Sequence, residues 1–227
     1  MVRTVAPAAP SPRPPFVPGD DAVRRWYEDA LGWPTAPGAP VRLVTGVRFD
    51  VLDVPAEAGR AALEHLGRSG ALGRGFPVAL GEGRMRLLVA AGSAEELPGL
   101  LEWLDWGALE LELVALGADG LMTAPRPPAA GSGGGPGRTA RPLPPGRDGS
   151  QGAAVWLRPP EPGRGAEAPL PTLSAMGTRG GARGDRGGPP DLVRLVNTVA
   201  TQVHRARLRR VRTPATVRTD GQPLAFS

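Results

Sequence analysis

Glycine and proline restrict what this chain can fold into more than any other feature of its sequence. The 227 residues include 33 Gly and 28 Pro, far above the usual combined share of about 12%. Residues 128–190 alone hold 28 of them. A segment of this composition cannot bury enough apolar surface to offset the chain entropy lost on folding. We therefore expect disorder over 1–18, 128–190 and 213–227.

The remaining composition excludes several classes of chemistry. Cys is absent, which excludes disulfides and thiolate chemistry. All 27 basic residues are Arg, Ile is absent, and Asn occurs once. Since Ala, Gly, Pro and Arg have GC-rich codons, we infer a high-GC bacterial genome and give arginine richness itself little functional weight. No apolar run approaches the ~18 residues of a membrane span, and no signal-peptide pattern is present, so we expect a cytoplasmic protein.

Hydrophobic periodicity places one folded domain at 19–127. It predicts helices from Asp20 to about Gly32, over 56–66, and from a capping Ser93, with Glu96 completing a capping box, to Trp106. Strands are predicted at 41–44, 47–54, 76–80, 85–91, 109–116 and 121–124. Pairs of strands joined by short turns, alternating with helices, indicate an α+β fold with a mixed, mostly antiparallel sheet and helices packed on it.

Two segments beyond this domain are also predicted to form secondary structure. Residues 153–158 interrupt the Pro/Gly-rich linker, and we expect them to add an edge strand that buries Trp156. Residues 191–212 predict a basic amphipathic helix, whose apolar stripe consists of Leu192, Leu195, Val196, Val199 and Val203. Its C-terminal end carries Arg205, Arg207, Arg209, Arg210 and Arg212.

Charge is divided unevenly along the chain. Residues 19–127 hold 10 Arg and 16 acidic residues, net −6, whereas residues 128–227 hold 15 Arg and 6 acidic residues, net +9. A basic tail on an acidic domain predicts either an anionic partner or a tail that folds back on its own domain. Nucleic acid and the chain's own acidic domain rank equally as partners of this tail, another protein ranks with the acidic domain, and an anionic membrane surface ranks last.

The stretch TGVRFDVLDVPAEAG, residues 45–59, is the most informative motif. Further matches in order and spacing are 111–114, Gly117, Gly120, 124–127 and Trp156 with Arg158-Pro159. Over about residues 20–160 the chain resembles the N-terminal domain of bacterial bifunctional DNA primase/polymerase proteins, which have the archaeo-eukaryotic primase fold. The overall composition of the chain is also similar to that of small, uncharacterised, proline-rich actinomycete proteins. This second resemblance implies no known activity.

The resemblance implies nucleotidyl transfer by two metal ions held by carboxylates. Asp53 matches the first carboxylate and Glu112 the third, but Pro55 replaces the second. Asp50 cannot simply take that place, because residues i and i+3 of a regular strand face opposite sides. The resemblance also implies a histidine that contacts the nucleotide, just before the strand that follows the hairpin. This chain has Arg84-Met85-Arg86 at that place and no histidine.

These departures favour a degenerate, non-enzymatic module that binds nucleic acid or protein, with no cofactor. Arg84, Arg86 and the five C-terminal arginines are its expected nucleic-acid-binding residues. The enzyme alternative is a divergent nucleotidyltransferase using Asp50, Asp53 and Glu112 with Mg²⁺ or Mn²⁺, with Asp53 the candidate metal ligand. We also expect that Asp53 caps the next helix, with both hairpin arginines in solvent.

Overall fold

The computed structural model describes residues 19–72, 75–128, 154–161, 170–173 and 191–212. Its helices are α1 (Asp20–Arg25), continued by the π-helix η1 (Trp26–Ala30), α2 (Ala56–Arg68), α3 (Ser93–Trp103) and α4 (Leu192–Arg212). Its strands are β1 (Thr35–Ala36), β2 (Arg42–Val44), β3 (Asp50–Pro55), β4 (Val78–Gly81), β5 (Arg84–Val89), β6 (Val114–Leu116), β7 (Leu121–Thr123) and β8 (Val155–Arg158). This order matches the sequence prediction apart from the short strand β1.

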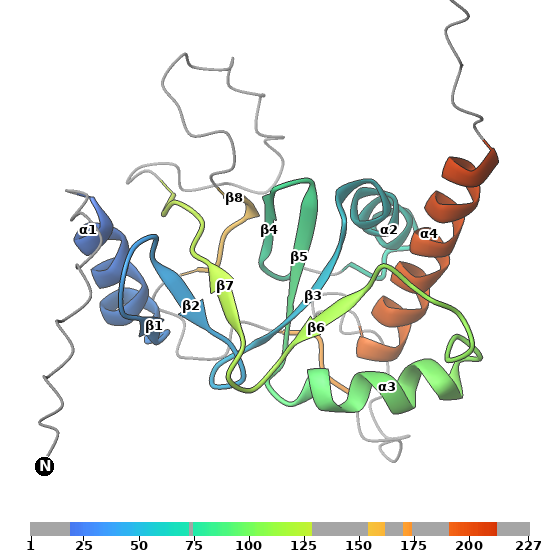
Figure 1. Ribbon diagram of the computed structural model, residues 1–227, viewed down its shortest axis with the longest axis horizontal. Helices are drawn as coiled ribbons and strands as arrows, with labels where there is room; N and C mark the ends of the chain where they lie inside the picture. Colours follow the sequence, from blue (N-terminus) through green and yellow to red (C-terminus); the bar gives the residue numbers. More distant parts are fainter. Residues whose placement is uncertain (1–18, 73–74, 129–153, 162–169, 174–190, 213–227) are drawn as a thin grey trace, which may run out of the picture.

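The strands form two sheets, in which all pairings among the described residues are antiparallel. One sheet has the order β6-β3-β5-β4-β8 and the other the order β1-β2-β7. Helices α2, α3 and α4 gather at one end of the molecule and α1 lies at the other (Figure 1). The predicted α+β class is confirmed, although two antiparallel sheets replace the one expected sheet.

Strands β3 and β5 form the centre of the larger sheet, whose two faces are both covered. They pair over their full lengths, with Asp53 opposite Arg86. Since side chains alternate along a strand, Leu52 and Val54 face a core shared with α2, α3 and α4, whereas Val51 faces a second, aromatic core. Burial on both sides explains why this segment is almost continuously apolar.

The aromatic core holds strand β8 in place. Trp156 of β8 donates a hydrogen bond from Nε1 to the Tyr27 hydroxyl at 3.0 Å, and that hydroxyl donates to the carbonyl of Pro125 at 2.7 Å. The ring of Trp33 stacks on Tyr27 and packs at an angle against Phe49 and Trp156. Burial raises the pKa of Tyr27 well above its ordinary value, so the phenol remains a donor. β8 pairs with the edge of β4, as predicted for 153–158.

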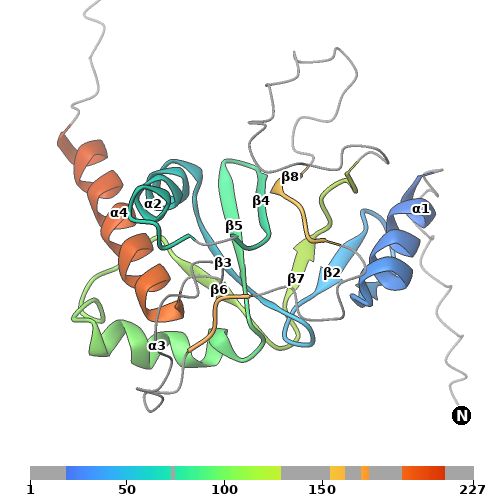
Figure 2. The ribbon, with the colours of Figure 1, turned by 180° about the vertical axis from the view of Figure 1, so that it is seen from behind.

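Helix α4 lies inside the helix core, although the sequence analysis left residues 191–212 outside the 19–127 domain. Leu195, Val196 and Val199 are fully buried, in contact with the residues of α2 and the sheet. Figure 2 shows α4 lying alongside α2, with the N-terminal end of α4 near α3. No helix among the described residues combines the length and apolarity needed to cross a membrane.

The segment after α3 differs from its prediction for a tertiary reason. The helix expected to reach Trp106 ends at Trp103, and Asp105 follows with a φ of 60°. Trp106 then donates a hydrogen bond from its indole nitrogen to Asn197 of α4 at 3.0 Å. Contact with α4 therefore draws the chain away from the sheet, and the strand expected over 109–116 shortens to β6.

We expect Leu195→Ala to lower the free energy of unfolding by about 2–5 kcal/mol, because it opens a cavity between α4 and the sheet. Leu208→Ala is the matched control on the same helix, since Leu208 is 47% exposed. This control is expected to change stability by less than about 0.5 kcal/mol. Chemical denaturation measures both values, and equal small losses would contradict the packing of α4 in the core.

Candidate functional site

The small residues of the motif pack two turns against each other. The hydroxyl of Thr45, between β2 and β3, donates to the carbonyl of Gly117, between β6 and β7, at 2.6 Å. Gly46 has a φ of +83°, and a β-carbon there would lie 2.4 Å from Cα of Ala118. One at Gly120 would lie 2.4 Å from Oγ1 of Thr45. Gly is required at position 46 because the backbones of the two turns touch there, and at position 120 because the Thr45 hydroxyl occupies the space of a β-carbon.

Asp50 is a buried cap for α3. Its side chain is on the helix side of β3, and its Oδ2 accepts a hydrogen bond from the backbone nitrogen of Ala94 at 2.8 Å. The expected capping box of Ser93 and Glu96 is therefore wrong: the N-cap position is Gly92, and no side chain of the local sequence caps the helix. A carboxylate at a helix N-terminus also interacts favourably with the helix dipole.

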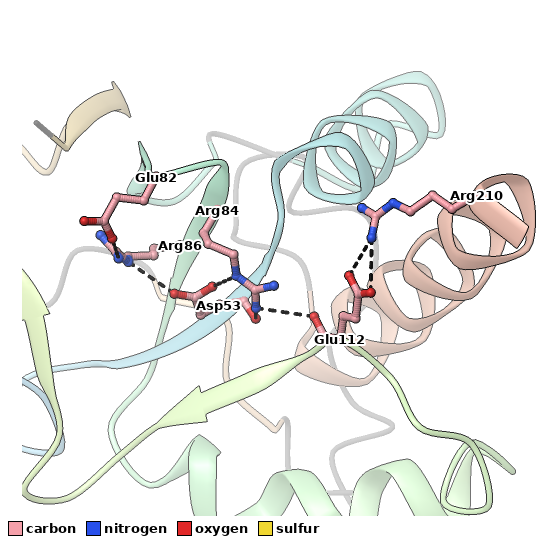
Figure 3. A network of polar contacts seen from close by, with 6 residues as sticks. All are labelled: Asp53, Glu82, Arg84, Arg86, Glu112 and Arg210. Carbon is pink, nitrogen blue, oxygen red and sulfur yellow. Dashed lines mark hydrogen bonds and ion pairs between the residues drawn. The ribbon is translucent and has the colours of Figure 1, made fainter. Parts of the chain in front are cut away.

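Asp53 lies on the opposite face of β3, held by two arginines of β5 (Figure 3). Its Oδ1 accepts from Nε of Arg84 at 2.5 Å, and its Oδ2 accepts from Nε of Arg86 at 3.2 Å. Arg86 also pairs with Glu82 at 3.5 Å. The expectation that Asp53 caps α2 is wrong, since α2 has no side-chain cap. Nor are both arginines solvated, because Arg86 is buried.

Glu112 faces α4 rather than Asp53. Its carboxylate accepts hydrogen bonds from Nη1 of Arg210 at 2.8 and 3.1 Å, and only its backbone carbonyl meets Arg84, at 3.4 Å (Figure 3). Pro55 pairs with Arg84 in the sheet and is buried, so it brings no ligand to this place. The predicted carboxylates are thus distributed among three different contacts: with α3, with β5 and with α4.

This arrangement does not fit the metal ions that the resemblance implies. A divalent cation at Asp53 would face the guanidinium groups of Arg84 and Arg86, whose positive charge opposes its binding. Asp50 reaches the other face of the strand, where its Oδ2 is engaged by α3. The described residues contain no group of three His, Cys, Asp or Glu side chains placed to hold a metal.

The arginines of α4 divide into two sets. Arg207, Arg209 and Arg210 pair with Glu110 at 3.6 Å, Glu57 at 3.1 Å and Glu112 at 2.8 Å, respectively. Arg205 and Arg212 are exposed, and their side chains have no hydrogen bond or ion pair with any described residue. Sequence reasoning did not identify Glu57 or Glu110 as partners, although the opposite net charges of domain and tail indicated that such pairs could form.

Arg158, another residue of the motif, is enclosed at the end of β8. A β-carbon at Gly75 would lie 2.1 Å from its Nη1, so the guanidinium packs directly on the glycine backbone. Burial lowers the pKa of Arg158 from its ordinary value. The motif residues Thr45, Gly46 and Arg158 therefore all serve packing in this chain.

We expect Asp53→Asn to lower the free energy of unfolding by about 3 kcal/mol, because it leaves the buried charge of Arg86 with only the exposed Glu82 as its counter-charge. Glu82→Gln is the control, since the Glu82 side chain is 64% exposed and its ion pair is worth less than about 1 kcal/mol. Urea denaturation measures both. A more stable Asp53→Asn variant would contradict the structural role and mark a carboxylate retained for function.

Comparison with known proteins supplies no relative: no family model, no curated protein and no solved structure matches this chain.

Proposed function

We propose that this chain is a non-enzymatic, cytoplasmic nucleic-acid-binding module, built on a degenerate primase-polymerase-like scaffold. The observation that carries the proposal is the placement of α4. One side of this helix is buried in the core, while the five arginines at its C-terminal end are all exposed. A fixed helix that presents several guanidinium groups to solvent has the charge and donor geometry that phosphate recognition uses.

The contacts of the carboxylates support the non-enzymatic part of the proposal. Two-metal nucleotidyl transfer needs carboxylates that converge on ions ~4 Å apart. Asp50 caps α3, Asp53 on the opposite face of β3 binds two arginines, and Glu112 binds α4. These contacts give each carboxylate a separate structural partner.

Three of these arginines are already paired with glutamates of the body. Arg205 and Arg212 are not, since their side chains have no hydrogen bond or ion pair with any described residue. Contact of such side chains with phosphates releases counterions from the nucleic acid, a favourable effect at low salt. Arg84 and Arg86 are not part of this surface, because both bind Asp53.

We expect fluorescence anisotropy to show salt-sensitive binding of labelled DNA by the full-length chain. Replacing Arg205 and Arg212 together with Gln should reduce the slope of log Kd against log salt by about 2, since each phosphate contact contributes about 1. The matched control replaces Arg42 and Arg48, which are also exposed but lie in and beside β2. Truncation is unsuitable, because removing α4 would remove part of the core.

Absence of binding to single- and double-stranded DNA and RNA would contradict the proposal and direct attention to a protein partner. Equal losses in the two variants would show that binding depends on overall positive charge and not on the position of α4. A separate assay tests the enzyme alternative. Nucleotide incorporation that requires Mg²⁺ or Mn²⁺ and disappears in a folded Asp53→Ala variant would overturn the non-enzymatic assignment.

A further inference from the structure

Three arginines form a straight line along the outer side of α4. Positions 194, 205 and 212 fall within about 20° of one another around a helix of 3.6 residues per turn, and the line is about 27 Å long. Arg194 lies outside the C-terminal cluster that the sequence analysis identified. All three are exposed, and their side chains make no hydrogen bond or ion pair within the described part of the chain.

The rest of this outer face offers few groups that could read nucleic-acid bases. Thr198 and Thr201 lie between the arginines, but their hydroxyls donate to the α4 carbonyls of Arg194 and Asn197, both at 2.8 Å. Asn197 is exposed, but its Oδ1 is engaged by Trp106, and Leu208 is apolar. The guanidinium groups are thus the charged donors of the face, and they match phosphate oxygens. Because phosphate contacts position a protein without reading bases, such a face binds independently of sequence.

The other three arginines of the helix point toward the protein. Arg207, Arg209 and Arg210 meet glutamates of the segment before β6 and of α2. Residues 19–127 carry a net charge of −6, so a polyanion is repelled from the body and attracted to the outer side of α4. This division of charge confines contact to the line of Arg194, Arg205 and Arg212.

We propose that this line binds the phosphate backbone of double-stranded nucleic acid without sequence preference. The inference rests on the proposed function and specifies its partner. A duplex is a stiff rod with one charge per about 1.7 Å, whereas tight single-strand binding without sequence preference uses aromatic platforms on which bases stack. The outer face of α4 is straight and carries arginine, threonine and leucine, which suits the stiff rod.

Two triple variants of the full-length chain test this inference. One changes Arg194, Arg205 and Arg212 to Gln; the matched control changes Arg207, Arg209 and Arg210 to Gln, which alters net charge equally. Anisotropy is measured with two duplexes of equal composition and scrambled sequence, and with one single strand, at about 50 and about 200 mM salt. Three phosphate contacts predict that the wild type loses about 40-fold in affinity over this range. Circular dichroism confirms that both variants are folded.

The expected result is equal binding of the two duplexes, weaker binding of the single strand, and a salt slope lowered by about 3 only in the outer variant. Equal losses in both variants, tighter binding of the single strand, or a tenfold preference for one duplex would overturn the inference while leaving nucleic-acid binding intact. Wild-type protein that binds no nucleic acid would instead refute the proposed function. Binding to anionic phosphatidylserine vesicles but not to duplexes, lost in the outer variant, would assign the line to a membrane surface.

Discussion

The burial of the apolar side of α4 is the interaction on which the rest of this structure depends. Leu195, Val196 and Val199 complete the core between α2 and the five-stranded sheet, although α4 follows a long Pro/Gly-rich segment. Burying each such side chain stabilises the fold by about 1.5–3 kcal/mol. That gain offsets the entropy lost when the helix docks, so the basic end of the chain acquires one orientation relative to the acidic body.

The docking of α4 also determines how charge is distributed over the surface. The side of α4 toward the body meets acidic residues, and its opposite side keeps its arginines in solvent. Asp50 stabilises α3 at its N-terminus, and Asp53 pairs with two arginines of β5. Gly46 and Gly120 lie where the turn after β2 and the turn after β6 are in close contact. In this chain the carboxylates of β3 therefore hold neighbouring elements together.

Sequence analysis could predict the helices, the order of most strands and the edge strand around Trp156, because these follow from local periodicity and from the drive to bury an indole. It also predicted correctly that Asp50 and Asp53 face opposite sides, which strand geometry alone requires. It could not predict that Asp50 caps α3 in place of Ser93, or that Asp53 meets Arg86, since both contacts depend on pairing between distant segments. Arg194 is a different case: helical spacing relates it to Arg205, but it lies 11 residues before the dense run of arginines that marks the basic end of the helix.

The most direct test of the role of α4 is an NMR titration of the arginine Nε–Hε resonances with a short DNA duplex, using the full-length chain. We expect the resonances of Arg194, Arg205 and Arg212 to shift together as duplex is added, while those of Arg84 and Arg86 stay in place because Asp53 holds them. Shifts centred on Arg84 and Arg86 would place the nucleic acid at the face of β3 and β5 that carries Asp53 and would contradict an interface on α4.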